Sequence, residues 1–484
     1  MAATRNSSRN TLRTFIASEY QADGSIRPTT YTLRGSPAVG WEVVREGALH
    51  LRLDQGYELL EASHCGVCST DLARRHLPFR LPQIIGHEVV ARDDLGQAVV
   101  VEINASHRGC ALPEREWCAF CRAGLDTHCP ERLVLGIHDL PGGFSPWLLA
   151  PAGNILQLPA AITPLTATLV EPFAAALHAV RTLALADGDR VAVLGPRRLG
   201  LLVIAALAAW RQQSSRRYEI LAVARRLELR DLARTLGADD TLDAMAAHNM
   251  HDIADVVVET TGHPDGLALA IQLARREVHV KSTTGQATLG LTHLTELVVD
   301  EIGLDRFQRS KIEALASARP GPASVVQIGT VPQSIRAEVD AHDLRTIAGT
   351  DPAELARQLA LEPLGAADVA LVTSVAGIDA ALRPIVGVER GLVRARGTIL
   401  VADVGQPRDA LLAALLDKGL RISSTRCGDF RAALDILAAT DLGHHLGEIM
   451  VTNVLPADRL AEAFELAASP RSIKVVVTHD HSLL

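Results

Sequence analysis

Three short segments carry side chains that could hold a reactive metal ion. They are HCGVCSTD from His64 to Asp71, GHE from Gly86 to Glu88, and Glu171 with the proline that follows it. A cysteine, a histidine and a carboxylate from separate segments suit a catalytic zinc, because three protein ligands leave the fourth position for water or a substrate oxygen. Zinc would then act as a Lewis acid and lower the pKa of a bound alcohol. Thr70, a hydroxyl close to the cysteine, would pass the alcohol proton outward.

A second set of possible ligands follows in one loop. The cysteines are Cys110, Cys118, Cys121 and Cys129, and the middle two are separated by two residues. Four thiolates gathered in one loop form a closed tetrahedral zinc site, which stabilises a lobe and has no open position for catalysis. The alternative is that they are reduced surface cysteines. Six of the seven cysteines lie between Cys65 and Cys129, and no export signal is recognisable, which favours metal ligation over disulfides.

The segment that begins RVAVLGPRRLGLL at Arg190 is typical of a strand, a glycine turn and a helix that bind a dinucleotide. Gly195 and Gly200 occupy the first and third glycine positions, where the chain turns tightly and the pyrophosphate approaches the helix N-terminus. Arg197 stands at the middle position, where it would either crowd the pyrophosphate or place a cation beside it.

The strand EILAV lacks the acidic residue that would bind the 2′-hydroxyl of the adenosine ribose, and Arg225 and Arg226 follow it instead. Two arginines suit a 2′-phosphate, which predicts NADP in preference to NAD. The alternative is that they are solvated charges at the start of a helix.

Composition excludes several classes of partner. The 484 residues carry a net charge of −8 and only 3% aromatic side chains, which argues against nucleic acid. The longest apolar stretch, Gly200 to Trp210, is too short to span a bilayer. The first ten residues, rich in arginine and serine, are interpreted as a disordered tail, with a transit-like segment as the alternative. We therefore expect a cytoplasmic enzyme whose partner is a small-molecule substrate.

The pattern of apolar residues and turn residues changes near Pro164. Before it, short apolar runs broken by glycine and proline predict an all-β module; after it, strands and helices alternate, which predicts a parallel sheet. A second strand–helix series follows Glu301. Its segment Ala367–Gly377 is similar to Ala254–Gly262, and each is followed by a strand that ends at a glycine, Gly405 and Gly285. A partial duplication and a chance similarity both explain this.

These motifs together resemble the zinc-containing medium-chain dehydrogenases, the superfamily of alcohol, sorbitol and threonine dehydrogenases. The resemblance rests on HCGVCSTD, IIGHEVV, CAFCRAGLDTHC, VEPFAAAL, VLGPRRLGLL and VVVETTG, and covers about Leu59 to Asp300 and Leu420 to Thr478. It implies a fold of class α/β plus β, with a GroES-like β-barrel catalytic domain and a Rossmann parallel-sheet domain. The catalytic domain would span 41–165, completed by 449–484, after an N-terminal extension at 1–40. The Rossmann domain would span 166–302 and 419–448.

The resemblance also implies roles for individual residues. Cys68, His87 and Glu171 would bind the catalytic zinc, Thr70 would belong to the proton relay, and Glu88 would be a carboxylate close to the metal. Cys110, Cys118, Cys121 and Cys129 would bind a second, structural zinc, although the spacing after Cys110 is longer than in the family. The expected cofactor-binding residues are Gly195, Arg197, Leu199, Gly200, Arg225, Arg226, Thr261 and Lys281. A homo-oligomer, either a dimer or a tetramer, is also implied.

The region 303–418 has no counterpart in the family pattern. Its recurring apolar strands and helices predict an inserted α/β lobe, a partial copy of the Rossmann half. The copy offers only Gly329 at the turn after its first strand, so we expect it to bind no dinucleotide and to serve packing, oligomer contacts or cover of the active site. For the whole chain the expected activity is hydride transfer between an alcohol or polyol and NAD(P). The alternatives are internal redox followed by elimination on the same fold, and a non-catalytic cofactor-binding scaffold.

Overall fold

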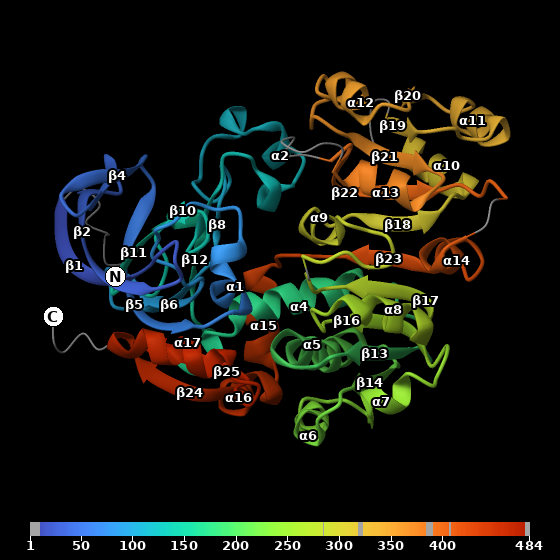
Figure 1. The fold of residues 1–484 in the computed structure, drawn as a ribbon. Coiled ribbons are helices and arrows are strands. Elements are labelled where there is room, and N and C mark those ends of the chain that lie inside the picture. The colour runs from blue at the N-terminus through green and yellow to red at the C-terminus, as the bar shows by residue number, and fades with distance from the viewer. Residues whose placement is uncertain (1–9, 284, 318–322, 384–390, 406–407, 480–484) are drawn as a thin grey trace. The chain divides into compact units, whose positions relative to one another are not determined.

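The computed structural model describes residues 10–283, 285–317, 323–383, 391–405 and 408–479 (Figure 1). The chain forms two compact units. Unit 1 comprises Met1–Ala174 and Cys427–Leu484, and unit 2 comprises Ala175–Arg426. The predicted catalytic segments, 41–165 and 449–484, lie in unit 1, and the predicted insertion, 303–418, lies in unit 2. The expected tail falls almost entirely on residues 1–9, outside the described residues.

Unit 1 is mainly β-structure. Its strands are β1 (Thr11–Tyr20), β2 (Ile26–Ser36), β3 (Gly40–Arg45), β4 (Ala48–Leu53), β5 (Tyr57–Gly66), β6 (Glu88–Arg92), β7 (Ala98–Val101), β8 (Asn104–Ala105), β9 (Leu133–Leu135), β10 (Asp139–Leu140), β11 (Trp147–Pro151), β12 (Ile155–Gln157), β24 (Val451–Pro456) and β25 (Lys474–Thr478). Its helices are α1 (Ser69–Leu72), α2 (Ala119–Arg122), α3 (Pro164–Ala167), α15 (Phe430–Ala439), α16 (Asp441–Met450) and α17 (Leu460–Ala468). Helix α4 (Val170–Thr182) begins in unit 1 and ends in unit 2.

Two sheets make up most of unit 1. The first, β1-β2-β3-β4, includes most of the expected N-terminal extension, because β1 and β2 form an antiparallel hairpin that continues onto β3. Burial alternates along β1, so that Phe15, Ala17 and Glu19 face inward, as in a half-buried strand. The second sheet has the order β12-β7-β6-β5-β25-β24, with β11 also paired to β5. The C-terminal strand β25 thus joins the sheet that positions the metal-binding motifs.

Unit 2 is an α/β unit built on one sheet. Its strands are β13 (Arg190–Leu194), β14 (Glu219–Val223), β15 (Asp240–Leu242), β16 (Ala254–Glu259), β17 (Ala274–Val280), β18 (Gly303–Arg306), β19 (Ala323–Ile328), β20 (Leu344–Gly349), β21 (Ala367–Val372), β22 (Val393–Val401) and β23 (Arg421–Ser424). Its helices after α4 are α5 (Arg198–Ser214), α6 (Leu227–Thr235), α7 (Ala244–Ala247), α8 (Pro264–Leu273), α9 (Leu294–Val299), α10 (Arg309–Ser317), α11 (Gln333–Asp340), α12 (Pro352–Leu359), α13 (Val375–Leu382) and α14 (Ala410–Leu416).

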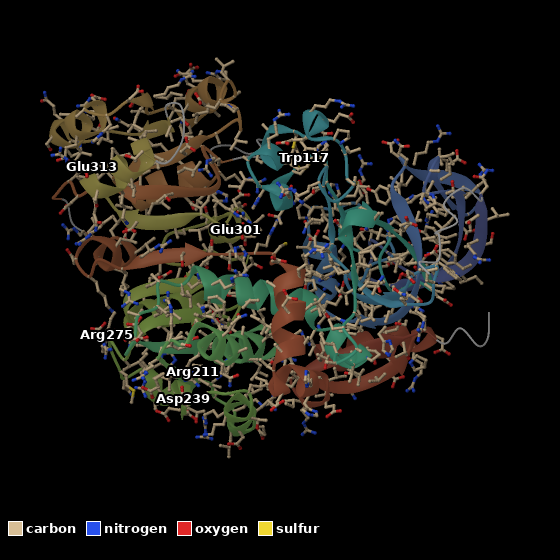
Figure 2. All side chains as sticks on the ribbon, turned by 180° about the vertical axis from the view of Figure 1, so that it is seen from behind. Trp117, Arg211, Asp239, Arg275, Glu301 and Glu313 are labelled. Carbon is tan, nitrogen blue, oxygen red and sulfur yellow. The ribbon has the colours of Figure 1, made fainter. Side chains whose placement is uncertain are left out.

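The strand order of unit 2 is β15-β14-β13-β16-β17-β23-β18-β22-β21-β19-β20 (Figure 1). The first six strands have the order of a Rossmann domain, with β13 first in sequence and central in space. Central strands such as β13 and β16 are apolar and buried along almost their whole length, as expected where helices cover both faces. Near the edge strand β15, Arg211 of α5 forms an ion pair with Asp239 at 2.5 Å (Figure 2).

The α/β nature of the insertion is confirmed. Residues 303–418 supply strands β18 to β22 and helices α10 to α14, and these strands extend the Rossmann sheet instead of forming a separate one. A single hydrophobic core passes through both parts and includes Val278, Ile422, Leu304 and Ile399. Among the described residues, none of the helices combines the length and the apolar character needed to cross a membrane.

Candidate functional site

The expected catalytic cysteine and histidine lie side by side in unit 1. Strands β5 and β6 are antiparallel, and Gly66 at the end of β5 pairs with Glu88 at the start of β6. Cys68 follows β5 as the residue before α1, and His87 precedes β6, so the pairing brings both to one point. One ligand atom each from Cys68, His87 and Glu88 lies within 4.8 Å of the others. A thiolate, an imidazole and a carboxylate at this spacing are a donor set that suits zinc.

Asp71 contacts both Cys68 and His87 and holds them in place. Its carboxylate accepts a hydrogen bond from the backbone N–H of Cys68 at 2.8 Å, and its other oxygen lies 3.4 Å from Nδ1 of His87. Burial lowers the pKa of His87, but the charges of Asp71 and Cys68 outweigh it and raise the pKa well above its ordinary value. A carboxylate behind a metal-binding histidine orients the ring and increases its basicity. Asp71 is the last residue of the motif HCGVCSTD, and the motif alone does not reveal this role.

Glu88 also has a partner that local sequence did not reveal. The ammonium group of Lys474, the first residue of β25, forms an ion pair with Glu88, and both side chains are almost fully buried. Lys474 also lies 3.4 Å from the carbonyl oxygen of Val67, next to the cysteine. Lys474 therefore neutralises Glu88 beside the Cys68–His87 pair. No local sequence pattern links Lys474 to Glu88, because the two residues lie far apart in the chain and meet only through the pairing of β25 with β5.

Thr70 lies at the same site. Its hydroxyl oxygen is 3.6 Å from the sulfur of Cys68, and the side chain is half-buried on α1. Glu171 is not among the residues whose ligand atoms come together around Cys68 and His87. It lies in the first turn of α4, close enough to Glu102 to act on it. Burial raises the pKa of Glu102 to about 7, and the negative charge of Glu171 adds to this increase.

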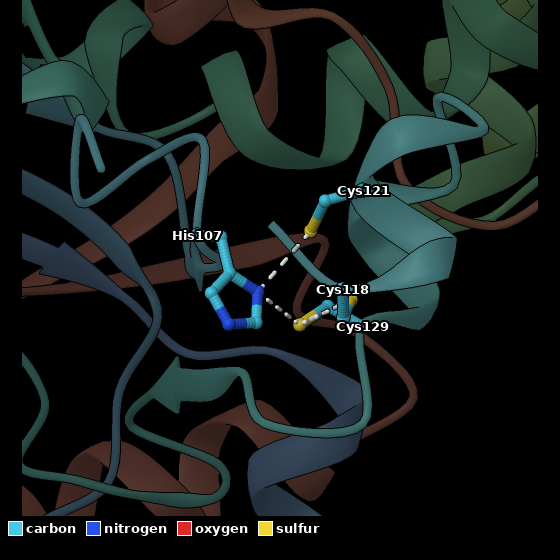
Figure 3. Close-up of side chains that lie close together, drawn as sticks. All are labelled: His107, Cys118, Cys121 and Cys129. Atoms are coloured by element: carbon cyan, nitrogen blue, oxygen red, sulfur yellow. Dashed lines mark hydrogen bonds between the residues drawn. The ribbon is translucent and has the colours of Figure 1, made fainter. Parts of the chain in front are cut away.

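The second cluster contains three of the four expected cysteines and one histidine (Figure 3). Nδ1 of His107 lies 3.5 Å from the sulfur of Cys121 and 3.3 Å from that of Cys129. The sulfur atoms of Cys118 and Cys129 are 3.7 Å apart. Cys118 precedes α2 and Cys121 lies within it, so one short helix presents two of the sulfurs.

The structure groups His107, and not the expected Cys110, with the other three cysteines. The thiol of Cys110 points to the hydroxyl of Tyr57, 3.4 Å away, and His107 takes the fourth position of the cluster. Cys110 thus lies apart from the three sulfur atoms, whereas the ring of His107 points toward those of Cys121 and Cys129. Burial and the neighbouring Cys129 raise the pKa of Cys121 to about 12. Thiols held this close favour the thiolate only when a cation is present, so the donor set fits a metal.

In unit 2 the glycine turn has the form that a dinucleotide requires. Gly195 has φ = +77°, and a Cβ there would lie 2.6 Å from the side chain of Thr261. A Cβ on Gly200 would lie 2.4 Å from the hydroxyl of Thr260, so neither position accepts a larger residue. Thr260 donates to the carbonyl oxygens of Leu194 and Gly195 at 2.9 and 3.1 Å. The turn is thus held against the end of β16.

Several arginines surround this turn. Arg197 precedes α5, and its pKa is lowered first by burial and then by the nearby charges of Arg198 and Arg226. Arg226 precedes α6 and lies 3.5 Å from Glu228, while Arg225 is exposed and Leu199 is half-buried. Mutual repulsion among cations is relieved by an anion, so the group suits a ligand with several phosphates.

Lys281 has a different environment from the one expected of a residue that contacts the cofactor. Its ammonium group is buried and donates to the carbonyl oxygens of Thr425 and Arg426 at 2.7 and 2.8 Å. These bonds join the end of β17 to the segment that follows β23.

Comparisons with known proteins agree with this architecture. Residues 54–160 match the alcohol dehydrogenase GroES-like domain. The chain is 30% identical over 229 residues to L-galactonate-5-dehydrogenase of Escherichia coli K12, covering 45% of this chain and 65% of that protein. It is 27% identical over 277 residues to L-threonine 3-dehydrogenase of Bacillus licheniformis, covering 51% of this chain and 74% of that protein.

The fold is also found in solved structures. L-idonate 5-dehydrogenase from Escherichia coli K-12 aligns with a TM-score of 0.58 at 14% identity, over 97% of this chain and 100% of the other. The chain spans slightly less than two thirds, 65%, of the length of L-galactonate-5-dehydrogenase, the first relative named above. In its GroES-like domain, in its relatives and in its fold, the chain is thus similar to the zinc-binding alcohol and polyol dehydrogenases.

Proposed function

We propose that the chain is a zinc-dependent dehydrogenase that oxidises a hydroxyl group of an alcohol or polyol with NADP, or reduces the corresponding carbonyl. The observation that carries this proposal is the grouping of Cys68, His87 and Glu88, with the Thr70 hydroxyl beside the sulfur of Cys68. The relatives are named as dehydrogenases of a sugar acid and of a hydroxy amino acid, which supports a polar, hydroxylated substrate.

The metal would be held by Cys68, His87 and Glu171, and it would supply Lewis-acid polarisation of the substrate oxygen. Asp71 fixes the histidine ring, and Lys474 keeps Glu88 from adding an uncompensated negative charge beside the metal. Thr70 would accept the substrate's hydroxyl proton and pass its own proton outward, while the carbon gives up its hydride to the nicotinamide. The dinucleotide supplies the hydride acceptor and would bind at the Gly195–Gly200 turn, its phosphates facing Arg197, Arg225 and Arg226.

The choice between the two glutamates is open to a direct test. Glu88 is already paired with Lys474, so we assign the third ligand to Glu171. Glu171→Gln should lose the catalytic metal, while Glu88→Gln should keep most of it and lose turnover. If Glu88→Gln loses the catalytic metal and Glu171→Gln keeps it, the metal is bound by Cys68, His87 and Glu88, the three residues whose ligand atoms lie together in the structure.

The activity itself is tested by mixing the purified protein with NADP and a panel of alcohols, polyols and sugar acids. Formation of reduced nicotinamide is followed by its absorbance. Cys68→Ala should remove one metal equivalent and abolish turnover without unfolding the protein. Full activity in that variant would exclude the assigned site.

A further inference from the structure

The sheet of unit 2 reads the same from both directions. Apart from the edge strand β15, which has no counterpart among the described strands, the order toward the middle is β14-β13-β16-β17-β23 on one side and β20-β19-β21-β22-β18 on the other. Within each half the neighbouring strands are parallel, and only the central pair, β23 with β18, is antiparallel. This is the arrangement of two copies of one fold related by a two-fold axis.

The pairing at the centre meets the requirement of such an axis. Leu304 and Ile422 are direct partners across β18 and β23. On its other side Ile422 pairs with Val278 of β17, and Leu304 pairs with Ile399 of β22. Each half therefore presents the same residue of the same strand, and an axis between these two residues exchanges the halves.

An aspartate motif occurs at equivalent places in both halves. Asp255 is the second residue of β16; it accepts from the backbone N–H of Arg190 at 2.8 Å and lies 3.4 Å from Arg275 (labelled in Figure 2). Asp368 is the second residue of β21; it accepts from the backbone N–H of Ser324 at 2.9 Å and pairs with Arg394 at 2.7 Å.

The registers make these positions equivalent residue by residue. Ala254 pairs with Ala274 and Ala367 pairs with Val393, which places Arg275 and Arg394 at the same position. In both pairings the register shifts across the aspartate, between Ala254 and Val256 in one half and between Ala367 and Val369 in the other. A carboxylate, a backbone donor and an arginine at equivalent positions, each set beside a register shift, are far more specific than two similar apolar strands.

The last helix and the last strand are exchanged between the two halves of the sheet. Each half of the sheet is completed by a helix and a strand that follow the other half in the sequence. Strand β18 follows the first half in sequence but pairs with β22, and β23 follows the second half but pairs with β17. The helices preceding them are exchanged as well. Asp379 of α13 accepts from the backbone N–H groups of Thr292 and His293, before α9, at 2.9 and 3.0 Å. Lys418, after α14, donates to the carbonyl oxygen of Ile271 in α8 at 3.0 Å.

The two exchanged strands are not interchangeable. Ser423 of β23 donates to Glu277 at 2.6 Å and lies 2.8 Å from Nδ1 of His279, all within the buried interior. The equivalent residue of β18 is Asp305, which pairs with Lys311 of α10. In the unexchanged arrangement the Asp305 carboxylate would face the buried carboxylate of Glu277, which is strongly unfavourable. The sequence thus favours the exchange.

We propose that residues 286–405 form a second, degenerate Rossmann half. This half pairs with β23, at the edge of the first half where a second copy of the chain would otherwise pair. An uncovered edge strand offers unpaired backbone groups to a second molecule. Here β23 is paired on both sides within one chain, so a dimer formed by sheet continuation at this edge is excluded, and any oligomer must use other surfaces.

The test is disulfide trapping at the axis in the full-length chain. Leu304→Cys with Ile422→Cys places two cysteines directly opposite each other, and oxidation followed by peptide mass spectrometry identifies the bond despite the native cysteines. We expect a 304–422 disulfide within one chain at every protein concentration. The matched control, Ile422→Cys alone, should give no dimer linked through that residue. A disulfide between chains in either variant would overturn the proposal.

A second measurement needs no substitution and covers the case in which the buried cysteines impair folding. In the unmodified protein, hydrogen exchange of the amides of β23 and β18 should be as slow as that of the central strand β13 at concentrations where sedimentation shows single chains. Fast exchange of β23 under those conditions would mean that its edge is open, and would equally overturn the proposal.

Discussion

The assignment of the fourth ligand in the cysteine cluster gives a sharp pair of variants, His107→Ala and Cys110→Ser. His107 lies within 3.5 Å of two cysteine sulfurs, whereas the Cys110 thiol donates to the hydroxyl of Tyr57. Structural zinc contributes about 10–16 kcal/mol of binding free energy in small metal-dependent domains. This is comparable to the whole free energy of unfolding of a typical domain, about 5–15 kcal/mol. Losing the ligand His107 should therefore release the metal and unfold its loop.

The effect of Cys110→Ser is much smaller by the same reasoning. The variant alters one hydrogen bond between a thiol and a phenol, for which a net contribution of about 0.5–1.5 kcal/mol is typical. We expect the variant to keep two zinc ions per chain and to melt within a few degrees of the unmodified protein. His107→Cys provides the conservative control, since it restores a common zinc donor and should restore the metal.

The assay is metal content per chain by mass spectrometry, combined with thermal unfolding before and after treatment with a chelator. His107→Ala should contain one zinc and should no longer be destabilised further by the chelator at the structural site. If Cys110→Ser loses a metal equivalent and His107→Ala keeps both, the cluster in solution contains Cys110, and the reasoning from the loop geometry is refuted.

Three further predictions concern the cofactor and the two halves of unit 2. Replacing Arg225 and Arg226 together by alanine should weaken NADP binding about tenfold, corresponding to about 1.4 kcal/mol, and leave NAD binding nearly unchanged; equal losses in a fluorescence titration would show that they are ordinary surface charges. The same titration should saturate at one dinucleotide per chain, since Gly329 is the only glycine of the second turn, and a stoichiometry of two would contradict this. Asp368→Asn, which weakens the buried pair with Arg394, should lower the melting temperature more than Asp255→Asn, whose pair with Arg275 is longer and more exposed; calorimetry showing the opposite order would reject this ranking.

Motifs that combine several ligand types in a short stretch were interpretable from sequence because their chemistry is local. Cys68 and Thr70 lie in one motif, His87 opens another, and the Gly195–Gly200 turn has few uses besides holding phosphates. The structure brings Cys68, His87 and Glu88 together as the antiparallel pairing of β5 and β6 requires. The alternating strands and helices likewise predicted the parallel sheet, including its continuation after Glu301.

Other features depend on contacts that no local pattern encodes. Lys474 reaches Glu88 only because β25 returns to pair with β5. His107 lies three residues before Cys110 in the same loop, and histidine is an ordinary zinc ligand, so a signal for it was present. It was overlooked because a fourth cysteine satisfied the expected composition. The hairpin of β1 and β2 lies in a segment treated only as an extension.

The exchange of helix–strand units also explains why the family resemblance stops and resumes where it does. The match ends near Asp300 and begins again near Leu420, and the residues Glu301 and Gly419 lie three positions before Leu304 and Ile422, the pair at the axis. Both have positive φ, +55° and +69°, so the backbone turns in the same way before each strand. Glu301 (labelled in Figure 2) needs support for this conformation, and it accepts from Arg396 at 2.6 Å and from the backbone N–H of Arg426 at 2.8 Å. The intervening residues therefore differ from a foreign domain placed in a loop, because they begin and end at equivalent points of a repeated fold. Removing them would take away the whole second half, strands β18 to β22, and would leave β23 with an open edge.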